Sequence, residues 1–117
     1  MNKSDLAYID HILDCIRKIN EFSNSLTLKE FVKNELVQDA IIRNIEIIGE
    51  ASKKISIDTK KIYYEIPWKE ITGMRDKLIH DYIGVDTKVV WKTIKEDIPA
   101  LERYLKEIEN SGMPPKG

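Results

Sequence analysis

The chain has 117 residues, of which 42% are hydrophobic and 33% charged, so it suits one folded domain and is neither disordered nor built to span a membrane. Its 19 basic and 20 acidic residues give a net charge of −1, which excludes the strongly basic surface typical of nucleic-acid binders and confines any RNA contact to a local patch. A single cysteine, Cys15, excludes an internal disulfide and a thiolate zinc cluster, and without a recognisable secretory signal we expect a cytoplasmic protein.

Apolar residues recur every three or four positions along most of the chain, which predicts α-helices rather than strands. Ser4 is the expected N-cap of the first helix. Thr27 and Glu30 form the pattern of a capping box and open a short extra helix. A long helix follows over residues 36–55. Asn44 lies within its apolar stripe, where we expect the amide to make a buried polar contact with another helix.

The third main helix follows a looser connection over residues 56–66. Pro67 suits the beginning of this helix, because proline lacks the N–H that would have no partner there. The apolar pattern then predicts helix over residues 68–82. Gly84 is the expected stop just beyond it, because glycine accepts the left-handed conformation at a helix end.

The last helix has Asp86 as its expected N-cap and an apolar seam with intervals of three and four residues. Pro99 removes a backbone hydrogen bond and should kink or restart this helix near Asp97. Residues 110–117 are expected to form a flexible tail. The predicted fold is therefore all-α: an antiparallel bundle of four main helices plus a short extra helix, in one domain over residues 1–109.

One segment, residues 73–82, combines residue types suited to phosphate chemistry. His80 can take up and release a proton near neutral pH, and the guanidinium of Arg75 can hold phosphate oxygens through two parallel hydrogen bonds. This pair is enough, in principle, to cleave RNA through attack of a ribose 2′-hydroxyl on its own phosphate, without a metal. The structural alternative is that Arg75 pairs with Glu46 or Glu50 and that His80 is a surface residue near a helix end.

On one straight helix these two side chains do not meet easily. Five residues separate them by about 140° around the helix and about 7.5 Å along it. Either the helix unwinds before Gly84, or a second copy of the chain completes the site across a two-fold axis. Both possibilities stay open at the level of the sequence.

The densest basic stretch lies between two predicted helices. It contains Lys53, Lys54, Lys60 and Lys61, opposed there only by Asp58. These lysines are candidates for contacts with an RNA backbone. The alternative is an ordinary solvated connection between helices, which charge runs commonly form.

Two groups of motifs, which together extend over nearly the whole chain, point to a known family. The first lies within residues 67–101 and places Arg75, His80 and Tyr82 before Val85-Asp86 and Trp91. The second lies in the predicted long helix and consists of Arg43-Asn44 and Ile48-Gly49-Glu50-Ala51. These motifs resemble the HEPN superfamily and, more narrowly, the HepT-like toxins of HEPN–MNT toxin–antitoxin pairs.

The resemblance implies a metal-independent ribonuclease toxin that acts as a homodimer and needs no cofactor. Arg75 and His80 of both subunits would line one cleft, with His80 as general acid and base and Arg75 holding the scissile phosphate. Tyr82 matches the tyrosine that a partner MNT-type nucleotidyltransferase antitoxin modifies with AMP. The added bulk and negative charge would block the cleft.

The chain departs from the family at the residue after the arginine, which is often Asn and here is Asp76. A carboxylate beside the phosphate would repel RNA unless it pairs with Lys77 or turns away. Asp76, Lys77 and Asp81 are therefore candidate supporting residues. A function of a different class remains open: a non-catalytic helical subunit that docks a nucleotidyltransferase. His80 separates the two, because only the ribonuclease needs its imidazole.

Overall fold

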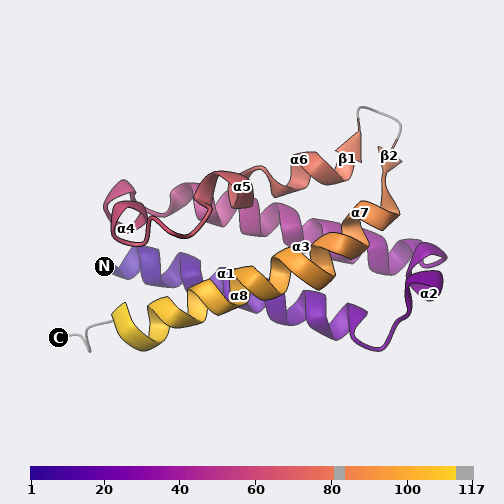
Figure 1. The fold of residues 1–117 in the computed structure, drawn as a ribbon, viewed down its shortest axis with the longest axis horizontal. Helices are drawn as coiled ribbons and strands as arrows, with labels where there is room; N and C mark the ends of the chain where they lie inside the picture. Colours follow the sequence, from indigo (N-terminus) through magenta and orange to yellow (C-terminus); the bar gives the residue numbers. More distant parts are fainter. Residues whose placement is uncertain (81–83, 113–117) are drawn as a thin grey trace.

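The computed structural model describes residues 1–80 and 84–112. Four helical layers, each made of one helix or of two consecutive helices, pack side by side and run alternately in opposite directions (Figure 1). The elements in chain order are α1 (Lys3–Ser23), α2 (Leu28–Val32), α3 (Glu35–Lys54), α4 (Ile57–Ile62), α5 (Trp68–Thr72), α6 (Met74–Leu78), β1 (Ile79–His80), β2 (Gly84–Val85), α7 (Thr87–Lys92), the π-helical turn η1 (Thr93–Asp97), α8 (Ile98–Glu107) and the π-helical turn η2 (Ile108–Gly112). The layers are α1, α3, α5 with α6, and α7 with α8, and α2 is the short extra helix. The predicted all-α bundle is confirmed.

The core is rich in isoleucine and lies between α1, α3 and the α7–α8 layer. Ile9, Ile12, Ile16 and Ile19 form the buried stripe of α1, at intervals of three and four residues. The predicted seam of the last helix is buried from Ile94 through Ile108. Each stripe faces another helix, so burial of apolar surface is the main force that holds the layers together.

Local hydrogen bonds set where the helices begin. The capping box is confirmed, since Thr27 accepts from the Glu30 N–H and the Glu30 carboxylate accepts from the Thr27 N–H. Asp86 is the N-cap of α7, as expected. The expected cap Ser4 is wrong, because Asn2 Oδ1 accepts from the Asp5 N–H at 2.7 Å and the helix begins at Lys3. Asparagine and serine cap helices about equally well, so the sequence alone does not separate them.

The connection over residues 56–66 contains the helix α4, which the sequence analysis did not predict. Ser56 caps it, and the buried Asp5 of α1 accepts hydrogen bonds from the Ser56 N–H, the Ser56 hydroxyl and the Thr59 hydroxyl at 2.9, 2.6 and 2.5 Å. Burial by itself would raise the pKa of Asp5, but these hydrogen bonds outweigh it and the pKa is lowered. Asp5 therefore ties α4 to the start of α1.

The predicted helix over residues 68–82 is wrong in its extent. It breaks at Gly73, which caps α5, and α6 ends at Leu78. Ile79–His80 is extended and pairs antiparallel with Gly84–Val85, and the Asp86 N–H donates to the Leu78 carbonyl at 3.2 Å. Gly84 thus belongs to a strand instead of stopping a helix. The break at Gly73 is favoured by its residue type, because glycine loses more backbone freedom in a helix than any other residue.

The last helix restarts at the predicted place. The backbone widens into the π-helical turn η1, and regular α-helix resumes at Ile98 with Pro99 in its first turn. Proline is accepted there because its missing N–H is not needed. The π-helical turn η2 continues to Gly112, so the first residues of the predicted tail are helical.

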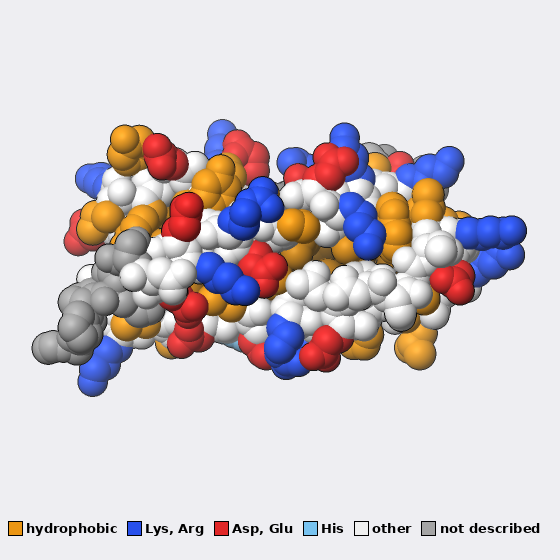
Figure 2. Space-filling view, turned by 60° about the horizontal axis from the view of Figure 1, so that its bottom comes forward, with side chains coloured by type: hydrophobic (Ala, Val, Ile, Leu, Met, Phe, Trp, Pro, Cys, Tyr) orange, Lys and Arg blue, Asp and Glu red, His pale blue; other side chains and the backbone are white. Residues whose placement is uncertain are grey.

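The surface carries charges of both signs. Figure 2 shows acidic and basic side chains interspersed over one face, with hydrophobic side chains between them. Within the described ranges, the structure holds no helix long and apolar enough to cross a bilayer.

The Asn44 amide donates to the Ala40 carbonyl on its own helix at 2.8 Å, so the expected contact with another helix is wrong for this group. A side-chain amide can satisfy itself on the preceding turn in this way.

Candidate functional site

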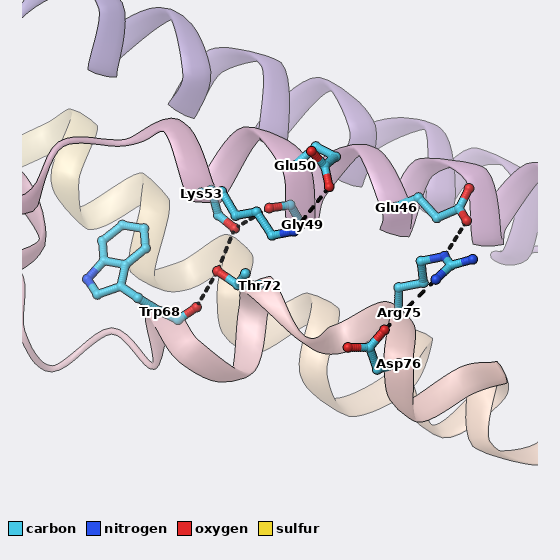
Figure 3. A network of polar contacts seen from close by, with 9 residues as sticks. Glu46, Gly49, Glu50, Lys53, Trp68, Thr72, Arg75 and Asp76 are labelled. Atoms are coloured by element: carbon cyan, nitrogen blue, oxygen red, sulfur yellow. Dashed lines mark hydrogen bonds and ion pairs between the residues drawn. The ribbon is translucent and has the colours of Figure 1, made fainter. Parts of the chain in front are cut away.

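The site is built on a close approach between α3 and α5. A Cβ atom added to Gly49 would lie 3.1 Å from the Thr72 carbonyl oxygen, so only glycine lets the two backbones come this near without adjustment. Next to it, the hydroxyls of Ser52 and Thr72 are 3.3 Å apart (Figure 3). This contact fixes the path of α5 over α3 and, two residues later, the place where α6 begins.

Arg75 extends from α6 to α3 and meets Glu46 (Figure 3). Its Nε–H donates to Glu46 Oε2 at 2.5 Å, and its Nη1 lies 3.9 Å from an Asp76 carboxylate oxygen. The hydrogen bond that Arg75 donates to Glu46 is the main cause that raises the pKa of Arg75 above its already high value, so the group stays charged. Of the two carboxylates that the sequence offered to Arg75, Glu46 is therefore the one that pairs with it. Glu50 pairs with Lys53 at 3.3 Å.

The pair with Glu46 leaves much of the guanidinium free to bind an anion. The Arg75 side chain is 49% exposed, and the interaction with Glu46 uses its Nε edge. The N–H groups of both Nη atoms are not used by Glu46 and can reach phosphate oxygens.

A groove of about 500 Å³ runs along α3 in front of Arg75, and we call it the Arg75 groove. It is lined by Tyr8 and His11 of α1, by Arg43, Glu46, Ile47, Glu50, Ala51 and Lys54 of α3, and by Arg75. The two carboxylates are each paired with a cation, Glu46 with Arg75 and Glu50 with Lys53. Arg43 and Lys54 add positive charge toward the two ends of the groove. The lining therefore suits an anionic chain.

His80 is no longer part of a helix. Because α6 ends at Leu78, the angle of about 140° that a continuous helix would impose does not apply. The helix therefore unwinds before Gly84, as the first of the two possibilities raised by the sequence requires. The structure places the His80 backbone at β1, next to the end of α6. Asp81 and Tyr82 lie outside the described residues.

The two candidate supporting residues beside Arg75 point to different places. The Asp76 side chain is 82% exposed, and one of its carboxylate oxygens lies 3.9 Å from Nη1 of Arg75. Asp76 also lines a pocket together with Lys53 and Lys60. Lys77 lines a separate hollow against α8, together with Asp97. Asp76 therefore does not pair with Lys77, and its mostly exposed carboxylate lies near Nη1 of Arg75.

The four candidate RNA-backbone lysines separate into different surroundings. Lys53 and Lys60 line one pocket of about 420 Å³. Lys54 lines the Arg75 groove, on the other side of the end of α3. Lys61, near the end of α4, lines neither.

Several residues of the site were missed in the sequence. Arg43 and Lys54 were not connected with Arg75, although their spacing with Glu46 and Glu50 places all four on one face of α3. His11 is exposed and also lines the groove. Cys15 is buried, and burial raises the pKa of its thiol, which agrees with a packing role. In the part of the chain that the structure describes, no three His, Cys, Asp or Glu side chains gather as metal ligands.

Comparisons with known proteins match this chain to one family. A family model described as "Ribonuclease HepT-like" matches residues 12–108. The chain is 49% identical over 102 residues to the "Probable ribonuclease HepT" of Thermococcus cleftensis, covering 87% of this chain and 93% of that protein. It is 42% identical over 106 residues to a "Putative RNase" of Caldanaerobacter subterraneus subsp. tengcongensis, covering 91% and 95%. It is 43% identical over 114 residues to a "Putative RNase" of Methanocaldococcus jannaschii, covering 93% and 94%. No solved structure matches the chain.

Proposed function

Because this chain belongs to the HepT-like ribonuclease family, we propose that it is an endoribonuclease toxin that cleaves RNA without a metal ion. The observation that carries this proposal is the Arg75 guanidinium, which is held at its Nε edge by Glu46 and opens onto a groove with further cations. His80 follows just after the helix of Arg75 has ended, so both residues belong to one short segment.

The proposed reaction is an intramolecular transesterification. The 2′-oxygen of a ribose attacks the adjacent phosphorus, so that a P–O2′ bond forms and the P–O5′ bond breaks. One imidazole accepts the proton of the 2′-hydroxyl, and an imidazolium gives a proton to the departing 5′-oxygen. Arg75 stabilises the negative charge on the other phosphate oxygens. The products end in a 2′,3′-cyclic phosphate and a 5′-hydroxyl.

A homodimer would supply the two imidazoles, one His80 from each protomer, around a single cleft. This arrangement also accounts for a site that one chain leaves open on one side. The Arg75 groove is lined by α1, α3 and α6 of one chain, and a second protomer would cover its open side.

Control by a partner enzyme completes the proposal. An MNT-type nucleotidyltransferase antitoxin in the same cytoplasm would transfer AMP from ATP to the phenol oxygen of Tyr82 and release pyrophosphate. Tyr82 stands two residues after His80 in the sequence. AMP there would add bulk and a negative charge next to the phosphate site, which repels RNA.

The second candidate function is a non-catalytic helical subunit that docks the nucleotidyltransferase. One observation favours it: Arg75 already has a carboxylate partner in Glu46 and a second carboxylate, Asp76, close by. In that case the ion pair would serve to hold α6 on α3, and the groove would bind no RNA.

The experiment that tests the proposed function compares the wild type with His80→Ala on single-stranded RNA in the presence of EDTA. We expect the wild type to cleave and His80→Ala to lose at least about 100-fold in rate, because it lacks the general acid and base. Circular dichroism checks that the variant is folded. A folded wild type that binds the nucleotidyltransferase but cuts no RNA would support the docking subunit instead.

A further inference from the structure

A second pocket lies where α3, α4 and α5 meet, and it ends at Asp76, the residue after Arg75. It has a volume of about 420 Å³ and is lined by Lys53, Lys60, Trp68, Lys69 and Asp76, together with Thr72 and Gly73. We call it the lysine pocket. In Figure 3, Trp68, Lys53, Asp76 and Arg75 follow one another along the interface of α3 with α5 and α6. The pocket is therefore bordered by the residue that directly follows the arginine.

The charge of its lining sets this pocket apart from the other hollows of the described chain. Here three lysines face one carboxylate. The Arg75 groove has three cations and two carboxylates, and the hollow at Lys77 has one cation against Glu70 and Asp97. Because the whole chain carries a net charge of −1, this local excess is the kind of patch that an anionic ligand would require.

Its cations are available to a ligand. Lys69 is exposed, and the Lys60 ammonium lies 6.0 Å from the centre of the Trp68 ring. Lys53 pairs with Glu50 at 3.3 Å, and because both side chains are more than half exposed, the three N–H groups of its ammonium leave donors for a phosphate beside Glu50. The single carboxylate, Asp76, already faces Arg75.

An aromatic side chain among the residues that line the pocket indicates which class of ligand the pocket binds. The Trp68 indole N–H donates to the Tyr63 carbonyl at 3.0 Å, which fixes the ring, and the ring is only half-buried. Cations that surround a fixed aromatic ring are the combination by which proteins hold single-stranded nucleic acids, with phosphates on the cations and a base or sugar on the ring.

We propose that the lysine pocket binds the RNA strand immediately beside the scissile phosphate, with Lys53, Lys60 and Lys69 holding neighbouring phosphates and Trp68 contacting the adjoining nucleoside. This inference rests on the proposed function, which places the scissile phosphate at Arg75. Of the four lysines that the sequence indicated as RNA contacts, only Lys53 and Lys60 line this pocket. Lys69, from a different part of the sequence, joins Lys53 and Lys60.

The test measures binding separately from cleavage. In a His80→Ala background, which leaves the RNA intact, the affinity for a fluorescein-labelled single-stranded RNA is measured by anisotropy at several salt concentrations. The pocket variant carries Lys53→Gln, Lys60→Gln and Lys69→Gln. Its matched control carries Lys18→Gln, Lys92→Gln and Lys106→Gln, which remove the same charge from α1, α7 and α8 and line none of these hollows.

We expect the pocket variant to bind RNA at least about 10-fold more weakly, with the slope of log affinity against log salt reduced by about 2. The control should keep most of the affinity. In a Trp91→Phe background, where Trp68 is the only tryptophan left, RNA should also quench the fluorescence. Equal losses of affinity in the two triple variants, or RNA binding without quenching, would overturn the proposal.

The outcomes also separate this inference from the proposed function. If the wild type does not cleave RNA but the pocket variant still loses affinity and salt dependence, the pocket stands and the ribonuclease proposal fails. If the wild type cleaves RNA and the pocket variant binds as the wild type does, the ribonuclease stands and the pocket fails.

Discussion

At the scale of single residues, the site depends on how Arg75 is held. Glu46 uses the Nε edge of the guanidinium, and this directs the remaining N–H groups away from the ion pair. A carboxylate that orients a catalytic cation in this way is a positioning residue, because it acts through another side chain. The alternative is that Glu46 competes with the phosphate for Arg75.

We expect Glu46→Ala to lower kcat by about 10- to 100-fold with little change in KM, as the loss of an orienting partner does at other sites. Glu46→Gln should recover part of the rate, because its amide oxygen can still accept from Nε. Asp39→Ala is the matched control, because Asp39 is an exposed carboxylate on α3 that lines none of the hollows described above. Cleavage by Glu46→Ala at or above the wild-type rate would show that Glu46 competes for Arg75.

The proposed modification at Tyr82 gives a second prediction at this scale. Tyr82→Phe removes only the phenol oxygen, so it should cleave RNA like the wild type but stay active after incubation with the nucleotidyltransferase and ATP. Intact-mass measurement should show added AMP on the wild type alone. Loss of cleavage in Tyr82→Phe without any partner would instead give the hydroxyl a direct part in the reaction.

Residue types indicated a chemistry for the site but not the contacts of its side chains. The types of Arg75 and His80 indicated phosphate chemistry, and Glu46 was one of two possible partners for the arginine. The sequence could not choose between Glu46 and Glu50, because that choice depends on where α6 crosses α3. The role of Asp76 was hidden for the same reason, since its direction depends on the break at Gly73.

At the scale of elements, the site depends on two short contacts that fix α4, α5 and α6 on the long helices. One is the close approach of α5 to α3 at Gly49, and the other is the hydrogen-bond cluster around Asp5. Both act on short helices, which would not be stable alone.

Gly49→Ala places a methyl group 3.1 Å from the Thr72 carbonyl. We expect it to lower the free energy of unfolding by about 1–3 kcal/mol through overpacking, despite the better helix propensity of alanine. Thermal and urea unfolding measure this. Gly73→Ala is the control, because its added methyl would lie at an ordinary 3.5 Å from the Lys69 carbonyl oxygen. Equal stability of the two variants would contradict the importance of the α3–α5 contact.

The lowered pKa of Asp5 predicts a dependence of stability on pH. The ionised carboxylate stabilises the folded state above the unfolded pKa of about 3.8, and this stabilisation is lost as the pH falls through the lower folded pKa. Asp5→Asn should therefore cost about 1–2 kcal/mol at neutral pH, and the difference from the wild type should shrink below about pH 4. Asp58→Asn, at an exposed position on α4, is the control. A constant difference across this range would contradict the prediction.

The long elements and the short helix α2, with its capping box, were predictable, and the other short elements were not. Stripes of isoleucine with helical spacing located α1, α3 and the last helix, because burial imposes this period over many turns. The helix α4 and the strands β1 and β2 are too short to show a period. The break between α5 and α6 was missed because Ile71, Met74 and Leu78 keep helical spacing across Gly73 and are all buried.

At the scale of the whole molecule, charge and shape limit where RNA can bind. The chain carries nearly equal numbers of positive and negative groups, and the described part measures 48 × 30 × 20 Å. An overall field that attracts RNA is therefore absent, and affinity must come from the Arg75 groove and the lysine pocket, each of which is lined by one residue of α6. A homodimer would double these surfaces around one two-fold axis.

The central claim is that Arg75 and His80 direct the 2′-hydroxyl of RNA at its own phosphate without a metal. The most direct measurement is the chemical nature of the new ends, after the wild type has acted on a defined RNA in EDTA. We predict 2′,3′-cyclic phosphate and 5′-hydroxyl ends, with no products from a substrate that carries 2′-deoxyribose at the cleavage site. Products with 5′-phosphate ends that form only when a divalent metal is added would contradict the account.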